Sequence, residues 1–128
     1  MTSFFLIFSH TLTPEQATDA KNSLGIENLV SLPENLKTLW GNVPPDAELD
    51  FATYLQPLKD FLAATAQAHD VVLIQGDFGA TFYLVNHCKQ AGYTPVYATT
   101  ERVAIEQAQP DGSVVLQKVF KHKAFRKY

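Results

Sequence analysis

Residues 70–102 decide the fold and read DVVLIQGDFGATFYLVNHCKQAGYTPVYATTER. The apolar run Val71–Ile74 leads into a short turn that contains two glycines. A helical stretch follows and ends at Gly92, and a second run begins at Pro95. This succession predicts a βαβ unit of a parallel sheet. Ligands of such sheets bind beyond the carboxyl ends of the strands, so we expect a ligand site among the small polar residues there.

The segment before this unit predicts a second one. Phe4–Phe8 is a continuous apolar run, which is typical of a buried central strand. A helix is expected next, with Thr13 as N-cap, Pro14 at its first position, Gln16 closing a capping box and Gly25 as the stop.

The rest of the chain predicts further elements of an α/β domain. In order, they are a strand over 26–32, a short helix over 34–40, a long helix over 50–68 that Pro57 kinks or divides, a strand over 70–75, a helix over 78–91 with Phe82, Val85 and Cys88 inward, and a strand over 93–98. The apolar stripe from Phe51 to Leu62 favours packing on the sheet over a dimer surface. Pro110-Asp111-Gly112, between strand-like runs at 103–108 and 114–120, predicts a hairpin that closes the sheet, with 121–128 trailing from it.

We therefore expect one domain over residues 1–128. Its predicted class is α/β, a Rossmann-like three-layer sandwich with a mostly parallel central sheet and a C-terminal β-hairpin. The single cysteine, Cys88, excludes an internal disulfide and a cysteine-rich zinc site, and it fits a reducing, cytoplasmic setting. The N-terminal apolar run is too short for a membrane span and lacks a signal-peptide pattern.

The charge is unevenly distributed along the chain. The net charge of −3 argues against coating of duplex nucleic acid. Five of the ten basic residues lie in the last eleven positions, where there is no acidic residue. An acidic body with a basic tail suits a small polyanion bound at one place, and a solvated, frayed terminus explains the same run equally well.

Four groups of residues are candidates for this ligand site. Ser9, His10 and Thr11 follow the first strand, where His10 suits a general base and Ser9 a phosphate donor, or the pair simply caps the loop. Gly76, Asp77, Phe78 and Gly79 open a helix whose N-terminus attracts phosphate, although a tight turn capped by Asp77 is at least as good an explanation.

The third and fourth groups supply cations and hydroxyl groups. Thr99, Thr100, Glu101 and Arg102 end the fourth expected strand and suit ribose and phosphate recognition; the alternative is an exposed Glu101–Arg102 surface pair. In the tail, Lys121, His122 and Arg126 offer charge and a second imidazole, and Phe125 or Tyr128 a stacking surface for a base. His10 and His122 together would give a base and an acid. No His/Asp/Glu cluster has metal-ligand spacing, so we expect neither a metal nor a cofactor.

Four stretches resemble the small stand-alone CRISPR-associated proteins of the Csx type. They are Phe8–Thr13, the Gly76–Gly79 turn, Tyr97–Arg102, and Asp111–Ser113 with its continuation to Val119–His122 and Phe125-Arg126. The resemblance spans nearly the whole chain and implies a CARF-like fold and a homodimer. It also implies a ring nuclease that degrades cyclic oligoadenylate, the second messenger of type III CRISPR antiviral defence. In such enzymes a ribose 2′-hydroxyl attacks the adjacent phosphate without metal.

The residues allow three functions. The first is a ring nuclease acting on cyclic oligoadenylate, with cyclic tetra-adenylate as the expected ring, in which His10, Arg102 and His122 are catalytic. The second is a sensor or sponge that binds the ring without cutting it. The third is an interaction subunit that uses the Phe51–Leu62 face.

Overall fold

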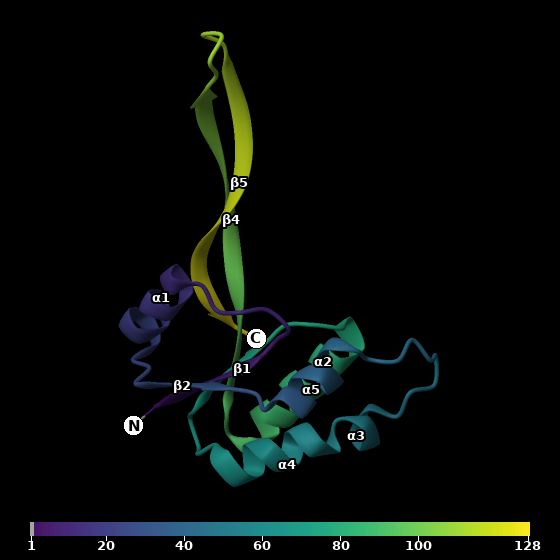
Figure 1. Ribbon diagram of the computed structural model, residues 1–128. Helices are drawn as coiled ribbons and strands as arrows, with labels where there is room; N and C mark the ends of the chain where they lie inside the picture. The colour runs from purple at the N-terminus through teal and green to yellow at the C-terminus, as the bar shows by residue number, and fades with distance from the viewer. Residues whose placement is uncertain (1) are drawn as a thin grey trace.

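The computed structural model describes residues 2–128 and is built on one five-stranded sheet of order β2-β1-β3-β4-β5 (Figure 1). Strands β2, β1, β3 and β4 are parallel, and β5 is antiparallel to β4. In chain order the elements are β1 (Ser3–Ile7), α1 (Pro14–Leu24), β2 (Asn28–Ser31), α2 (Glu34–Gly41), α3 (Phe51–Tyr54), α4 (Gln56–Thr65), β3 (Val71–Ile74), α5 (Phe78–Ala91), β4 (Thr94–Ala108) and β5 (Val114–Lys127).

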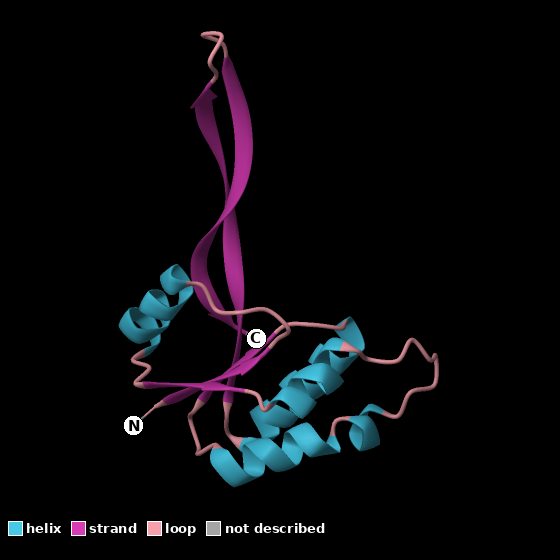
Figure 2. Cartoon of the chain, viewed as in Figure 1, coloured by secondary structure: helices cyan, strands magenta, loops and turns pink. Residues whose placement is uncertain are grey.

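The two faces of the sheet are covered unequally. Helix α1 packs on one face, and α2, α4 and α5 pack on the other, with α3 beside them (Figure 2). Alternate residues of the central strands serve the two layers: Phe4 and Leu6 face α1, whereas Phe5 and Ile7 face α2, α4 and α5. The arrangement is α/β with a mostly parallel sheet and a C-terminal antiparallel hairpin, consistent with the predicted Rossmann-like layout.

Local signals in the sequence set most helix ends as predicted. Thr13 and Gln16 form the capping box of α1, and Gly25 ends that helix with φ of 65°. The expected long helix over 50–68 is divided into α3 and α4 at Leu55, two residues before Pro57. A proline has no N–H to donate and fits the first turn of a helix, so Pro57 is accommodated at the second position of α4.

The prediction that Phe82 faces the core is wrong, because its side chain is 73% exposed. The buried stripe of α5 runs through Ala80, Leu84 and Cys88 at four-residue spacing, with Val85 beside it. Phe82 lies two residues from both Ala80 and Leu84, and this offset places it on the opposite side of the helix.

The C-terminal third differs most from expectation. Residues 99–102 do not end a strand, because β4 runs unbroken from Thr94 to Ala108. Residues 121–127 are not a trailing tail, because they belong to β5 and pair with residues 96–101. Polar and charged residues suit an antiparallel edge strand, whose exposed faces meet water, so their presence did not signal a loop.

The hairpin of β4 and β5 extends well beyond the rest of the molecule (Figure 1). We call residues 102–120 the arm. At its tip Gly112 has φ of 86°, and the Asp111 carboxylate accepts a hydrogen bond from the Ser113 amide, as the Pro-Asp-Gly turn predicts. At its base the pairing shifts between Thr99 and Thr100, so that Lys123 is an extra residue in a β-bulge.

Among residues 2–128, no helix combines the length and apolar character that a membrane crossing requires.

Candidate functional site

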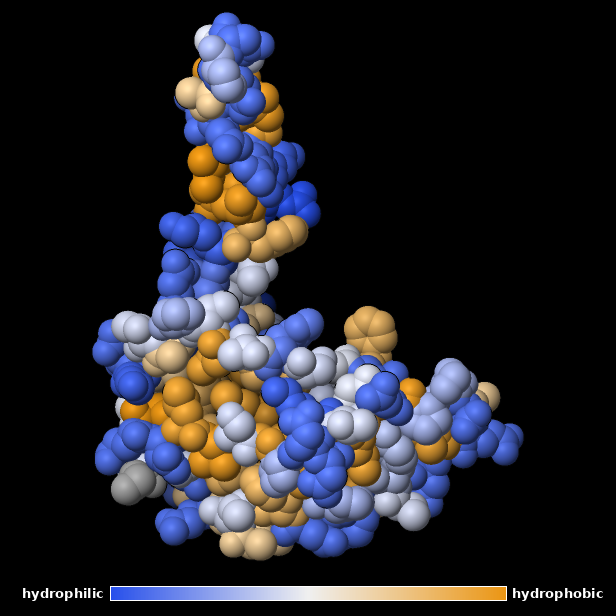
Figure 3. All heavy atoms as spheres, viewed as in Figure 1, coloured by the Kyte–Doolittle hydropathy of each residue, from blue (hydrophilic) through white to orange (hydrophobic). Residues whose placement is uncertain are grey.

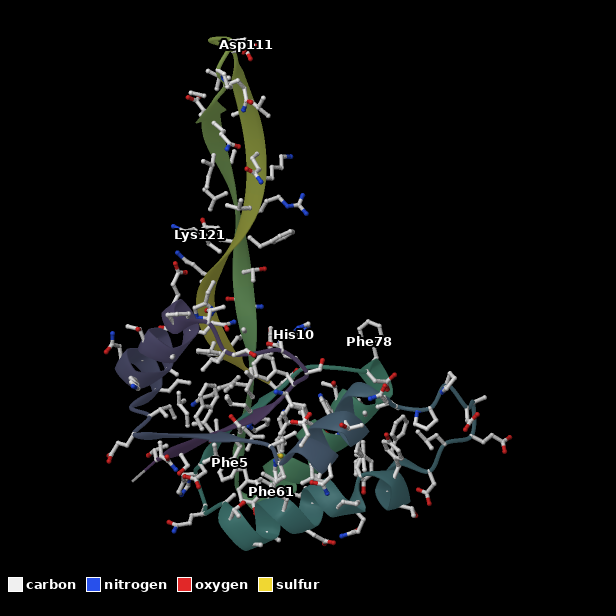
Figure 4. The ribbon with its side chains drawn as sticks, viewed as in Figure 1. Phe5, His10, Phe61, Phe78, Asp111 and Lys121 are labelled. Atoms are coloured by element: carbon white, nitrogen blue, oxygen red, sulfur yellow. The ribbon has the colours of Figure 1, made fainter. Side chains whose placement is uncertain are left out.

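The sheet changes its direction of winding between β1 and β3. From β1 the chain passes through α1 on one face to β2, and after β2 it passes through the helices of the other face to β3. Open parallel sheets bind ligands at such a point, beyond the carboxyl ends of the two strands. Residues 8–11 and 75–79 follow those ends, so the topology brings the two predicted loops to the same edge. His10 and Phe78 both lie at this edge in Figure 4.

Packing and capping explain three residues of the Gly76–Gly79 turn. A Cβ on Gly76 would lie 2.7 Å from Nε1 of Trp40, and one on Gly79 would lie 2.8 Å from the Phe51 ring. Asp77 is the N-cap of α5 and accepts a hydrogen bond of 3.0 Å from the Ala80 amide. Its carboxylate thus occupies the helix end where a phosphate would otherwise bind.

Packing does not explain Phe78. Its ring is 94% exposed at the first position of α5. An exposed ring at the carboxyl edge of the sheet offers a flat surface on which a nucleobase can stack.

His122 is fixed beneath the base of the hairpin. Its Nε2 lies 2.7 Å from Oδ2 of Asp19 on α1, and its side chain is only 7% exposed. Nδ1 has no hydrogen-bond partner among the described residues. The hydrogen bond from Ser23 and the contact with His122 together lower the pKa of Asp19 below its ordinary value of 3.8. The pair joins α1 to β5.

A cavity of about 580 Å³ lies between the first turn of α1 and the base of the hairpin. Thr100 and Lys121 are among its lining residues, and Phe120 brings an aromatic ring on which the Arg102 guanidinium rests, 5.1 Å from the ring centre. Its lining residues are Thr13, Pro14, Glu15, Gln16, Thr100, Phe120, Lys121 and His122. A phosphate beside Lys121 and an aromatic base on Phe120 match this chemistry.

His10 and Thr11 line a different cavity, a groove of about 210 Å³ between α1 and β2. Within one chain the structure therefore does not bring His10 and His122 into a common cavity. Ser9, Asp77 and Phe78 are exposed at the carboxyl edge and line none of the cavities described here, whereas Gly79 lines a third one between α3 and α5.

The remaining predicted residues lie on the hairpin. The Thr99 hydroxyl donates to the Ala124 carbonyl oxygen at 2.9 Å, which is an interaction within the sheet. Arg126 donates to the Tyr97 hydroxyl at 2.8 Å and lies on the face opposite His122. Phe125 packs edge-on against Phe4, with ring centres 5.2 Å apart, and so is not free to stack a base.

Sequence reasoning missed Asp19, Phe120 and the first turn of α1. Asp19 and His122 are 103 positions apart, and only the return of β5 along β4 brings them together. No local pattern marks that contact. Phe120 was assigned to a strand, and its exposure in the arm depends on how far the hairpin extends.

A comparison with protein-family models matches residues 2–126 to the family described as "Uncharacterized protein MJ1673 family". The chain belongs to the MJ1673 family. A curated relative, "Uncharacterized protein MJ1673" of Methanocaldococcus jannaschii, is 44% identical over 128 residues, which is all of this chain and 98% of that protein. No solved structure matches the chain. Because the MJ1673 match runs from the first strand to within two residues of the C-terminus, it includes the arm and His122 as well as the parallel sheet.

Proposed function

We propose that this protein is a CARF-like ring nuclease that binds and cleaves cyclic oligoadenylate. The observation that carries the proposal is the cavity at the base of the hairpin. There Lys121, Thr100 and Phe120 surround a space suited to one phosphate and one base, and the Asp19–His122 pair lies beside it. A ring of repeated adenylates offers that combination several times, and the exposed Phe78 ring provides a second stacking surface.

The proposed reaction is a transfer within the substrate. A ribose 2′-oxygen attacks the adjacent phosphorus, the bond from phosphorus to the 5′-oxygen breaks, and a proton passes to that 5′-oxygen. The products carry a 2′,3′-cyclic phosphate and a 5′-hydroxyl. Lys121 neutralises the phosphate, and the Asp19 carboxylate holds the His122 ring in place below it. His10, exposed at the carboxyl edge, is the proposed acceptor of the 2′-hydroxyl proton.

A sensor or sponge that holds the ring intact is the second candidate. It is favoured by the separation of His10 and His122 into two cavities and by the burial of the His122 side chain. Binding needs the cavity and its cation only, whereas cleavage also needs a proton acceptor near the 2′-hydroxyl.

Product analysis with cyclic tetra-adenylate separates the two candidates. We expect linear adenylates ending in a 2′,3′-cyclic phosphate, identified by chromatography and mass spectrometry, in the presence of a chelator as well as without it. Intact ring that stays tightly bound would favour the sensor, and loss of cleavage in the chelator would contradict the metal-independent step. Failure both to cleave and to bind would reject both candidates.

Two lysines near the bulge give a matched test of the cavity. Lys121→Ala is expected to weaken binding of the ring about tenfold or more, since it removes a charge-assisted contact with phosphate. Lys123 is two residues further along the chain, is exposed and does not line the cavity; its Nζ lies 3.9 Å from Oε2 of Glu101. Lys123→Ala removes the same charge as Lys121→Ala and is expected to change binding less than threefold.

The role of His10 is tested on the cleavage rate. His10→Ala is expected to reduce the rate by about 100-fold or more while the ring still binds, as for a general base. Cleavage by this variant at the rate of the unchanged protein would remove His10 from the mechanism and leave the Lys121 cavity as the binding site.

A further inference from the structure

Strand β4 has a long edge that no other strand covers. Its pairing with β3 reaches Val96, and the Ala98 amide then donates to Oε1 of Gln75 at 2.6 Å. Past that point β5 is the only strand beside β4 among the described residues. The other side of β4 is therefore open from Thr100 to Ala108, and we call it the free edge. The main-chain donors and acceptors of such an edge are a template for another strand.

Hydrogen bonds at the base of β4 show which main-chain groups point outward along the free edge. The amides of Thr94 and Ala98 donate on the β3 side, whereas the Pro95 carbonyl oxygen accepts on the β5 side. The N–H and C=O groups of even-numbered residues therefore point away from β5. The extra residue of the bulge lies in β5, so this alternation continues along β4. The residues that present both groups to solvent are Thr100, Arg102, Ala104, Glu106 and Ala108.

The outer edge of β5 is less suited to pairing than the free edge of β4. From Lys118 to Lys127 it has five basic residues and no acidic residue, and it contains the bulge. Runs of charge and bulges are devices that keep strand edges from pairing. The free edge instead carries both signs, with Arg102 and Glu106 at outward-pointing positions, and neither of these two makes an ion pair within residues 2–128.

The free edge is complementary to a second copy of itself. When two copies run antiparallel about Ala104, Arg102 of each copy lies opposite Glu106 of the other. On the opposite face of the strands, Val103 of each copy lies opposite Ile105 of the other. A register centred on Val103 or Ile105 separates the opposite charges, and one centred on Arg102 or Glu106 places like charges face to face.

We propose that two copies of this chain pair antiparallel along the free edge, with Ala104 of each copy beside a two-fold axis. The two arms then form a single sheet of order β5-β4-β4-β5. Ala104 is also the midpoint of the free edge, so the register that pairs the charges uses the whole edge. It forms about ten main-chain hydrogen bonds, two for each opposed pair of outward-pointing residues, which is typical of a specific interface.

The pairing also explains how the arm is stabilised. An isolated two-stranded ribbon is marginally stable in water, whereas more strands with a common apolar face are stable. Figure 3 shows apolar atoms along the exposed arm, and Ile105 is 45% exposed. In the paired sheet Val103, Ile105 and Val119 of both copies join in one apolar patch, because Val119 is the β5 neighbour of Val103. The pairing does not rest on the proposed function, and its test measures mass rather than activity.

Light scattering after size-exclusion chromatography tests the pairing and its register. The unchanged protein is expected to have twice the 14.2 kDa mass of one chain. Arg102→Glu and Glu106→Arg each place like charges opposite one another at two positions, and each is expected to raise the dissociation constant about tenfold or more. The double variant Arg102→Glu with Glu106→Arg restores opposite charges and is expected to dimerise. A mixture of the two single variants is expected to form a mixed dimer tighter than either variant forms alone.

Two prolines distinguish the edge of β4 from the edge of β5. Ala104→Pro removes an N–H group that points away from β5, so the pairing within the arm keeps its hydrogen bonds and the dimer is expected to dissociate. Lys118 is the β5 neighbour of Ala104, and its N–H group likewise points away from the strand pair. Lys118→Pro is therefore the matched control and is expected to stay dimeric. Circular dichroism and thermal unfolding of both variants check that the fold is kept.

Several results would overturn the proposal. They are a monomeric unchanged protein, assemblies larger than a dimer, a dimer that survives Ala104→Pro, and a dimer that Lys118→Pro dissociates while the fold is kept. A mixture of the two charge variants that pairs no better than either variant alone would also overturn it. The charge variants keep the main chain unchanged, so they decide the matter even where a proline unfolds the arm.

Discussion

Gly76 lies at the point where a strand end, a helix N-terminus and an indole ring meet. The Trp40 Nε1 donates a hydrogen bond of 2.9 Å to the Gln75 carbonyl oxygen, which holds the indole against the Gly76 backbone. The buried Trp40 ring, which is 2% exposed, leaves no room for a Cβ at position 76. This packing explains why the residue is glycine without a bound phosphate.

Gly76→Ala is accordingly expected to lower the free energy of unfolding by about 1–3 kcal/mol, the cost of overpacking a filled site. Urea denaturation measures this change. Gly41→Ala is the matched control, because its new Cβ would lie 3.6 Å from the Ser9 Cβ, an ordinary contact, and it should change stability by less than about 0.5 kcal/mol. Equal stability of the two variants would contradict the packing role of Gly76.

At the scale of elements, the Asp19–His122 contact holds α1 against the hairpin. A carboxyl whose pKa is lowered in the folded state stabilises the fold above its ordinary pKa. That contribution disappears as the pH falls through the lowered value. The contact between α1 and β5 should therefore weaken in acid below pH 3.8.

Asp19→Asn is expected to destabilise the protein at pH 7 by about 1 kcal/mol, the worth of a hydrogen bond at a partly exposed site. Denaturant unfolding of both proteins should show this gap at pH 7 and its loss well below pH 3.8. Asp60→Asn is the control, since Asp60 is an exposed carboxylate that accepts a hydrogen bond from the Gln56 amide. A gap for Asp19→Asn that stays constant with pH would argue against the ionic contribution.

The elements that sequence predicts well are those whose ends carry their own signals. Thr13, Gly25 and Asp77 act on backbone groups within a few residues, so the ends of α1 and the start of α5 follow from local chemistry. The return of β5 along β4 is a long-range pairing, and nothing within residues 121–128 distinguishes an edge strand from a solvated tail. The candidate site is therefore the part that the sequence predicts least well, because His122 and Lys121 reach the first turn of α1 only through that pairing.

At the scale of the whole molecule, Cys88 reports on the integrity of the core. Its thiol is 0% exposed in the layer formed by α2, α4 and α5, and burial raises its pKa to about 12. A thiol in this state has almost no thiolate at neutral pH and reacts only when the layer opens.

We expect no reaction of the folded protein with Ellman's reagent at pH 8 over an hour, and one thiol per chain in concentrated guanidinium. The reaction rate at intermediate denaturant should follow global unfolding, since Cys88 lies among strands and helices that must separate together. Rapid, complete labelling of the folded protein would show that this layer opens on its own.

The bulge at Lys123 has a consequence for how this molecule can change over evolution. Beyond it the two strands of the arm pair residue for residue up to the turn at 109–113, so the arm can gain or lose matched pairs of residues without disturbing the sheet below. A single residue gained or lost at the bulge acts differently, because it slips the register of one strand and turns its side chains to the opposite face. The length of the arm is thus free to vary among relatives, whereas the direction in which its apolar side chains face is set at one position.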